Sequence, residues 1–117
     1  MGGVEIHQGL LEVARANLKR GGISNCRLWC CDAAAFKDYD GFNWIFLFNP
    51  FSNLVMEQVI TNLVVSAQRV PRKITLLHVN YKNPGSHEIL GCHGFTEIAC
   101  HEAGEAKLRF YLLKAFQ

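Results

Sequence analysis

The chain has 117 residues, half of them apolar, and a formal net charge of +2. This length suits one domain with a hydrophobic core, and the composition excludes a disordered chain. The small charge excludes a nucleic-acid binder that depends on a strongly basic surface. No apolar run reaches the roughly 18 to 20 residues that a membrane helix needs. Five cysteines without a regular spacing, and no signal peptide, fit a reducing compartment. We therefore expect a soluble, cytoplasmic, single-domain protein with no membrane partner.

The first half of the sequence predicts strands that alternate with a helix. Residues 2–6 form a short apolar run, and residues 7–20 carry apolar side chains at helical spacing before Gly21 and Gly22 end the helix. Residues 26–33 and 43–50 predict two further strands, joined by a polar, turn-rich link. The continuous run "WIFLF", from Trp44 to Phe48, is typical of a strand buried on both faces in a parallel sheet, and we expect its aromatic rings in the core.

The second half predicts a long helix, a strand, a short helix and a hairpin. The long helix spans residues 53–69, with Ser52 as its cap and Pro71 beyond its end. A strand at 73–80 and a short helix stopped by Gly94 follow. Residues 95–102 and 107–116 then predict an antiparallel hairpin. Together these elements predict an α/β fold: a three-layer Rossmann-like sandwich whose mostly parallel sheet ends in a C-terminal antiparallel hairpin.

Carboxylates follow the first two predicted strands, at the sheet edge where ligands of parallel sheets gather. A carboxylate at Glu5 can accept both hydroxyls of a ribose diol. Asp32 can accept from an exocyclic amino group, while the backbone around Ala33 meets the ring nitrogens. We therefore predict an adenosine-binding site at Glu5, Ile6, Asp32 and Ala33. The simpler interpretations are a solvated acid at Glu5 and a helix cap or Asx turn at Asp32.

A second candidate site follows the third predicted strand, at Asn49, Pro50 and Phe51. The Asn49 amide can accept from a substrate amine, and the ring of Phe51 offers a flat surface for stacking. The simpler interpretation is that Asn49 and Pro50 only end the strand. The aromatic residue directly after them favours a catalytic site at these three residues.

The order of these motifs resembles a class I S-adenosylmethionine-dependent methyltransferase, from the second strand of that fold to its end. The segments that carry the resemblance are "GVEI", "LLEVARANL", "CCDAAAF" and "FLFNPF". The resemblance implies S-adenosylmethionine as the cofactor and methyl transfer near Asn49 to a small molecule, a protein or a nucleic acid. Family members that methylate amino groups usually carry Asn/Asp-Pro-Pro-aromatic, so Asn49-Pro50-Phe51, one proline short, suggests an amino group as the acceptor.

The family's glycine-rich loop after its first strand has no counterpart, because no G-x-G occurs in the sequence. The resemblance therefore implies a methyltransferase-like domain, residues 1–117, that is incomplete at its amino end and inactive by itself. In the family the absent strand lies between the strands that here end on Glu5 and Asn49. We thus expect exposed sheet edges through which the chain self-associates.

Two other functional classes remain open, and a third is disfavoured. The main alternative is a non-catalytic Rossmann-like binding or scaffolding subunit. A nicotinamide-dependent dehydrogenase is a weaker one, since it also needs a glycine-rich loop and does not explain the closing hairpin. A metal site is not expected, because no C-x-x-C pair occurs and the neighbours Cys30 and Cys31 point to opposite faces of a strand.

Overall fold

The computed structural model describes residues 1–48, 52–80 and 85–114. The chain forms two compact units, a first unit of Met1–Phe36 and a second unit of Lys37–Gln117. The expectation of a single domain stays a prediction.

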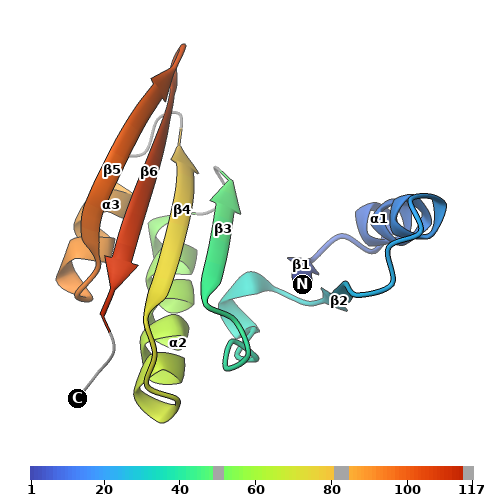
Figure 1. Ribbon diagram of the computed structural model, residues 1–117, viewed down its shortest axis with the longest axis horizontal. Helices are drawn as coiled ribbons and strands as arrows, with labels where there is room; N and C mark the ends of the chain where they lie inside the picture. Colours follow the sequence, from blue (N-terminus) through green and yellow to red (C-terminus); the bar gives the residue numbers. More distant parts are fainter. Residues whose placement is uncertain (49–51, 81–84, 115–117) are drawn as a thin grey trace. The chain divides into compact units, whose positions relative to one another are not determined.

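The first unit consists of two parallel strands connected by a helix. Strand β1 (Gly2–Glu5) pairs with strand β2 (Arg27–Cys30), and helix α1 (Gln8–Arg20) makes the connection between them (Figure 1). A short 3₁₀ helix, η1 (Ala33–Ala35), follows β2. Parallel strands need such a crossover because a tight turn cannot bring the chain back to the same edge of the sheet. The predicted strand–helix–strand order of this segment is therefore confirmed.

Helix α1 buries a narrower face than its apolar spacing suggests. Leu11 is only 1% exposed, whereas Leu10 and Val13 are each 57% exposed. The helix ends at Gly21, and Gly22 takes a positive φ of 68° that favours glycine. The ring of Trp29 on β2 meets the ring of Phe36, which follows η1, edge to face with 5.0 Å between their centroids.

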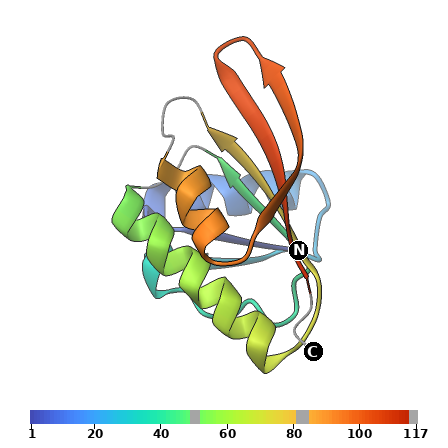
Figure 2. The same ribbon diagram turned by 90° about the vertical axis from the view of Figure 1, so that its left-hand side faces the viewer.

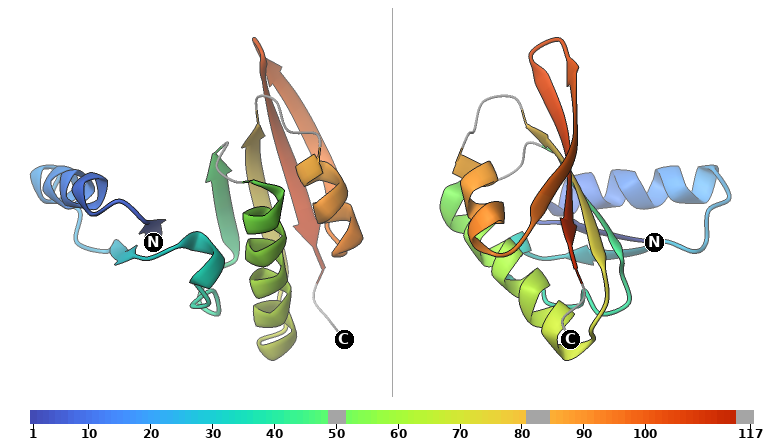
Figure 3. Two further views of the ribbon diagram at one scale, coloured as in Figure 1. Left: turned by 180° about the vertical axis from the view of Figure 1, so that it is seen from behind. Right: turned by 60° about the vertical axis from the view of Figure 1, so that its left-hand side comes forward.

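The second unit is a four-stranded sheet with two helices on one face. It contains β3 (Trp44–Phe48), α2 (Asn53–Arg69), β4 (Ile74–Asn80), α3 (Gly85–Cys92), β5 (Thr96–Ala103) and β6 (Ala106–Leu113). The strand order is β3-β4-β6-β5, in which β3 and β4 are parallel and the other neighbours are antiparallel. Both helices cover the same face of this sheet (Figures 1 and 3). The predicted α/β class and the closing hairpin are thus confirmed.

Helix α2 contributes one continuous apolar stripe to the core of the second unit. Its hydroxyl cap, Ser52 Oγ, accepts a hydrogen bond from the Val55 N–H, as the sequence predicts. Its buried side chains recur at intervals of three and four residues, which turns one continuous stripe toward the sheet. The stripe on the helix comprises Met56, Val59, Ile60, Leu63 and Ala67. Buried residues on the strands of the same unit include Ile74, Leu76 and Tyr111.

Strand β3 is not buried on both faces, so that part of the sequence-based prediction is wrong. Leu47 is 9% exposed, but Trp44 is 70% and Phe46 is 62% exposed. Alternate residues of a strand point to opposite faces, and the helices of this unit cover only one face of its sheet (Figure 2). Trp44 and Phe46 are therefore not core residues in this structure.

The guanidinium of Arg72 ties together the loop before β3 and the end of α2. It donates to the backbone carbonyls of Tyr39, Phe42, Ser66 and Val70, at 2.7 to 3.2 Å, and to the Ser66 hydroxyl at 3.0 Å. A rigid planar fork of five N–H donors suits such a set of acceptors. This contact fixes the amino-terminal ends of β3 and β4 relative to the helix that connects them.

Asp40 makes a second contact to the same helix end. Its carboxylate accepts from Arg69 Nε at 2.8 Å, from Arg69 Nη2 at 2.7 Å and from the Ser66 hydroxyl at 2.6 Å. The hydrogen bonds from Arg69 and then from Ser66 lower the pKa of Asp40 from 3.8 to about 2. The folded state therefore favours the ionised carboxylate.

We expect the stability of the chain to fall in acid partly through Asp40. A carboxyl whose pKa is depressed on folding stabilises the fold above its unfolded pKa, and this contribution is lost as the pH falls from about 4 to about 2. The variant Asp40→Asn should be less stable than the parent at pH 7, and the difference should shrink across that window. Urea unfolding at several pH values measures it, with Glu105→Gln, in the exposed hairpin turn, as the control. A difference that is constant with pH would contradict the expectation.

Candidate functional site

The structure places Glu5 and Asp32 at the same edge of the first unit's sheet. Glu5 is the last residue of β1 and pairs with Cys30, the last residue of β2. The Cys31 N–H donates to the Glu5 carbonyl at 3.2 Å and extends the pairing by one residue. Asp32 follows directly, so both carboxylates lie at the carboxyl ends of two paired parallel strands. The sequence predicted this juxtaposition, and the structure confirms it.

Glu5 also has a structural role. Its Oε1 accepts a hydrogen bond from the backbone N–H of His7, the residue that caps α1, at 3.0 Å. Within the described part of the chain no hydrogen bond reaches the other oxygen, Oε2. A carboxylate has about four acceptor positions, so one local bond leaves most of its capacity for a ligand. Ile6, the next residue and also a predicted site residue, is 58% exposed.

Asp32 has a comparable structural role at the start of η1. Its Oδ1 accepts from the Ala34 N–H at 2.9 Å, which is the Asx-type capping that the sequence left as an alternative. The side chain is exposed, and no hydrogen bond to Oδ2 is found among the residues that the structure describes. Ala33 lies at the first position of η1 and is half-buried. Capping and ligand binding are therefore compatible at Asp32.

The predicted catalytic residues Asn49, Pro50 and Phe51 lie outside the described residues. They follow Phe48, the last residue of β3. Because β3 and β4 are parallel, Phe48 ends β3 at the carboxyl edge of their sheet. Its assignment as a site rests on the sequence alone and stays a prediction.

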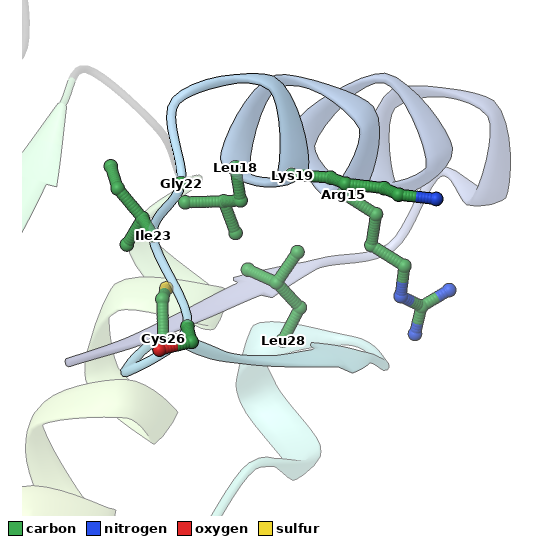
Figure 4. A pocket seen from close by; sticks show the side chains of 8 residues that line it. Arg15, Leu18, Lys19, Gly22, Ile23, Cys26 and Leu28 are labelled. Atoms are coloured by element: carbon green, nitrogen blue, oxygen red, sulfur yellow. The ribbon is translucent and has the colours of Figure 1, made fainter.

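A cavity of about 450 Å³ lies elsewhere in the first unit, between the second half of α1 and the start of β2 (Figure 4). Leu18, Ile23 and Leu28 give it an apolar lining, and Arg15 and Lys19 flank it. None of the predicted site residues lines it. Because β2 begins at this end, the cavity lies at the edge of the sheet opposite to Glu5 and Asp32, and it is not the adenosine site that the sequence predicts.

Two kinds of feature are not found in residues 1–48, 52–80 and 85–114. No helix there is both long and apolar enough to cross a membrane. No three side chains of the metal-ligating types His, Cys, Asp and Glu are grouped there so that they could hold an ion. The five cysteines all lie within these ranges and form no disulfide there.

A polar cluster that the sequence analysis missed lies between α3 and the hairpin. The Tyr111 hydroxyl is 2.9 Å from His87 Nδ1 on α3, and Arg109 lies close enough to act on the pKa of Tyr111. Arg109 in turn interacts with Cys100, and its Nε lies 3.4 Å from Glu97 Oε1. That Nε is buried, and its N–H has no acceptor with good hydrogen-bond geometry among the described residues. The cluster joins side chains from three elements.

Burial changes the protonation behaviour in this cluster. Burial raises the pKa of Tyr111, and the hydrogen bond from Arg109 offsets this only in part. The same hydrogen bond is the main reason that the pKa of Arg109 is raised. On the neighbouring strand, burial and then the charge of Arg109 lower the pKa of His78, which is 4% exposed. The cluster therefore contains a neutral phenol beside a permanent cation. In the sequence, the only signal for this polar cluster was the alternation of polar residues along the two hairpin strands.

The whole chain is similar in structure to several solved methyltransferases. It matches the N-methyltransferase NodS from Bradyrhizobium japonicum (TM-score 0.73, 14% identity) over 97% of this chain and 72% of that one. It matches a SAM-dependent methyltransferase from Aquifex aeolicus (0.70, 13%) over 96% of this chain and 68% of that one. It also matches a protein of the NADB-Rossmann superfamily from Streptococcus agalactiae (0.71, 17%) over 97% and 50%. The sequence matches no protein-family model and no curated protein.

The chain has the Rossmann-like fold of class I methyltransferases. It spans from 36% to 72% of the lengths of similar structures, so they contain segments without a counterpart here. In a Rossmann-like fold, ligands bind beyond the carboxyl ends of the parallel strands. Glu5 and Asp32 occupy that location, whereas the cavity beside α1 does not.

We expect Tyr111 to ionise at a higher pH than an ordinary tyrosine. The difference between the alkaline absorbance titrations of the parent and of Tyr111→Phe isolates this phenol from the two other tyrosines. Because burial raises its pKa, the midpoint of the difference curve should lie above the usual value of about 10. Circular dichroism at each pH shows whether the fold persists. A midpoint at or below about 10 in the folded chain would contradict the buried, neutral phenol.

Proposed function

We propose that this chain is the cofactor-binding part of an S-adenosylmethionine-dependent methyltransferase that acts on an amino group. The observation that carries the proposal is the pair of carboxylates, Glu5 and Asp32, at the carboxyl edge of two parallel strands in a methyltransferase-like fold. Each carboxylate keeps one oxygen without a hydrogen bond in the described part of the chain. An adenosine group offers the matching donors, a ribose diol and an exocyclic amine.

The residues of the first unit suit the adenosine part of the cofactor. Glu5, with Oε1 already oriented by His7, would accept the ribose hydroxyls through its remaining acceptor positions. Asp32 would accept from the adenine amine, and the backbone of Ala33 would meet the adenine ring nitrogens. Ile6, exposed beside Glu5, would contact the apolar side of the nucleoside. When bound, S-adenosylmethionine supplies an electrophilic methyl group.

The acceptor is proposed to lie next to Asn49. The Asn49 amide oxygen and the Pro50 carbonyl would accept the hydrogens of an amine and so direct its lone pair at the methyl group. Phe51 would stack on a flat acceptor. Positioning of this kind can lower a barrier by several kcal/mol without any acid or base. The similarity of the fold to an N-methyltransferase, NodS, supports an amino group as the acceptor.

The alternative is a non-catalytic binding or scaffolding subunit with the same fold. It is favoured by the absence of any G-x-G from the sequence, because that turn lets a backbone approach the cofactor in Rossmann-like folds. The two proposals differ in whether the chain binds the adenosine group, and calorimetry decides between them.

We expect weak but measurable binding of S-adenosylhomocysteine by the isolated chain, and weaker binding by Glu5→Gln. Glutamine keeps an oxygen for the His7 N–H but removes the charge that strengthens hydrogen bonds to the ribose. Hydrogen bonds to charged groups contribute roughly 1.5 to 3 kcal/mol, so the affinity should fall about tenfold or more. Isothermal titration calorimetry measures both affinities.

Glu12→Gln, an exposed acid on α1, is the matched control and should bind like the parent. Equal affinities for Glu5→Gln and the parent would remove Glu5 from the site while leaving the cofactor proposal standing. No binding by the parent at all would instead favour the scaffolding alternative.

We expect no methyl transfer by the 117-residue chain alone. The reason is that the sequence holds no glycine-rich turn to position the methionine part of the cofactor. Incubation with radiolabelled S-adenosylmethionine and a panel of small amines, proteins and RNAs tests this, with a complete methyltransferase as the positive control. Clear turnover would show that another segment of this chain holds the methionine part.

A further inference from the structure

The turn that carries Asp32 and Ala33 is too short to hold its own shape. Helix η1 has three residues, Ala33–Ala35, whose side chains are only methyl groups. The Ala35 N–H donates to the Asp32 carbonyl at 2.9 Å, and the Phe36 N–H donates to the Ala33 carbonyl at 3.3 Å. A single 3₁₀ turn is not stable by itself, because forming a first turn fixes several residues in return for very few hydrogen bonds. Contacts to other residues therefore have to hold this turn in place.

An aromatic pair closes the turn onto strand β2, within the first unit. Phe36 directly follows η1 and is buried. Its ring and the ring of Trp29 lie 5.0 Å apart at 63°, in the edge-to-face arrangement that aromatic pairs prefer. The guanidinium carbon of Arg27 lies 4.8 Å from the centroid of the Trp29 ring and adds a cation–π contact. The two ends of the segment 29–36, which contains Asp32, are thereby fixed to each other.

This closure sets the direction of the groups that the turn presents. Asp32 Oδ1 accepts from the Ala34 N–H at 2.9 Å, so the direction of Oδ2 follows the orientation of the turn. The backbone of Ala33 belongs to the same turn. A shift of the turn would therefore misplace both groups together. Glu5, at the end of the paired strand β1, would keep its position.

We propose that Phe36 is a positioning residue for base recognition, because it holds the turn in which Asp32 selects a base with an exocyclic amine. This inference rests on the proposed function, since it requires the adenine to lie beside Asp32. Without the ring of Phe36, the turn has more orientations to lose when a ligand binds, and the hydrogen bond to the amine becomes weaker. The ribose contact at Glu5 remains. The expected signature is thus a loss of base preference and not a loss of all binding.

Two ligands measure this preference on the full chain, S-adenosylhomocysteine and S-inosylhomocysteine. In the second ligand a carbonyl oxygen replaces the amine, so Asp32 meets an acceptor instead of a donor. Isothermal titration calorimetry should show that the parent binds the adenosine ligand about tenfold or more tightly, the effect of one hydrogen bond to a charged group. Phe36→Ala should bring the two affinities close together. Phe36→Leu keeps most of the apolar volume without the ring, should give an intermediate preference, and decides the matter if Phe36→Ala does not fold.

Leu11→Ala is the matched control, because it removes a side chain of the same unit that is only 1% exposed and lies on α1. It also lowers stability, but it should keep the base preference of the parent. A similar loss of preference in this control would show a general effect of destabilisation and would overturn the role of Phe36.

Amide hydrogen exchange, followed by nuclear magnetic resonance, tests the same role without a ligand. In Phe36→Leu the Ala34 N–H, which is bonded to Asp32, should exchange several-fold faster relative to the amides of the β1–β2 ladder. In Leu11→Ala this ratio should stay at the parent's value. An unchanged ratio in the Phe36 variants would contradict the positioning role.

The outcomes separate this inference from the proposed function. A parent that binds neither ligand overturns the proposed function, and the role of Phe36 in base recognition fails with it. A parent that binds both ligands equally, or Phe36 variants that keep the parent's preference, would overturn only the role assigned to Phe36.

Discussion

The arrangement of the second unit depends on one guanidinium group. Arg72 donates to the carbonyls of Tyr39, Phe42, Ser66 and Val70, which lie before β3 and at the end of α2. The last carbonyls of a helix have no partner within the helix, and unpaired buried groups cost about 1 to 3 kcal/mol each. Arg72 satisfies the Val70 carbonyl just beyond the helix and two loop carbonyls, adds a second bond to the Ser66 carbonyl, and so closes the β3–α2–β4 crossover at its amino-terminal edge. These contacts lie at the amino-terminal edge of the sheet. They therefore do not occupy the opposite, carboxyl edge, where a Rossmann-like fold binds its ligands.

Local signals in the sequence were sufficient to predict the helices and strands. The burial of a side chain depends on residues far away in the sequence, so local signals did not predict it. Helix α2 spans Asn53–Arg69 as predicted, because Ser52 as its cap and Pro71 beyond its end act within a turn of its ends. The burial of β3 was predicted wrongly, since a continuous apolar run does not reveal whether anything packs on the second face. The polar cluster at Tyr111 was missed for a similar reason. The strand register and its bulge bring Glu97 to Arg109, and helix α3 brings His87 to Tyr111, so none of these contacts is local in the sequence.

At the candidate cofactor site, a carboxylate that caps a helix can also be available to bind a ligand. The sequence offered a helix-capping role and a binding role for Asp32, and the structure shows the cap through the Ala34 N–H. Glu5 likewise accepts from the His7 N–H. Such bonds hold each carboxylate in one orientation before a ligand arrives, which lowers the entropic cost of binding. A capping bond is therefore compatible with a binding role, because it leaves the other oxygen available in a fixed position.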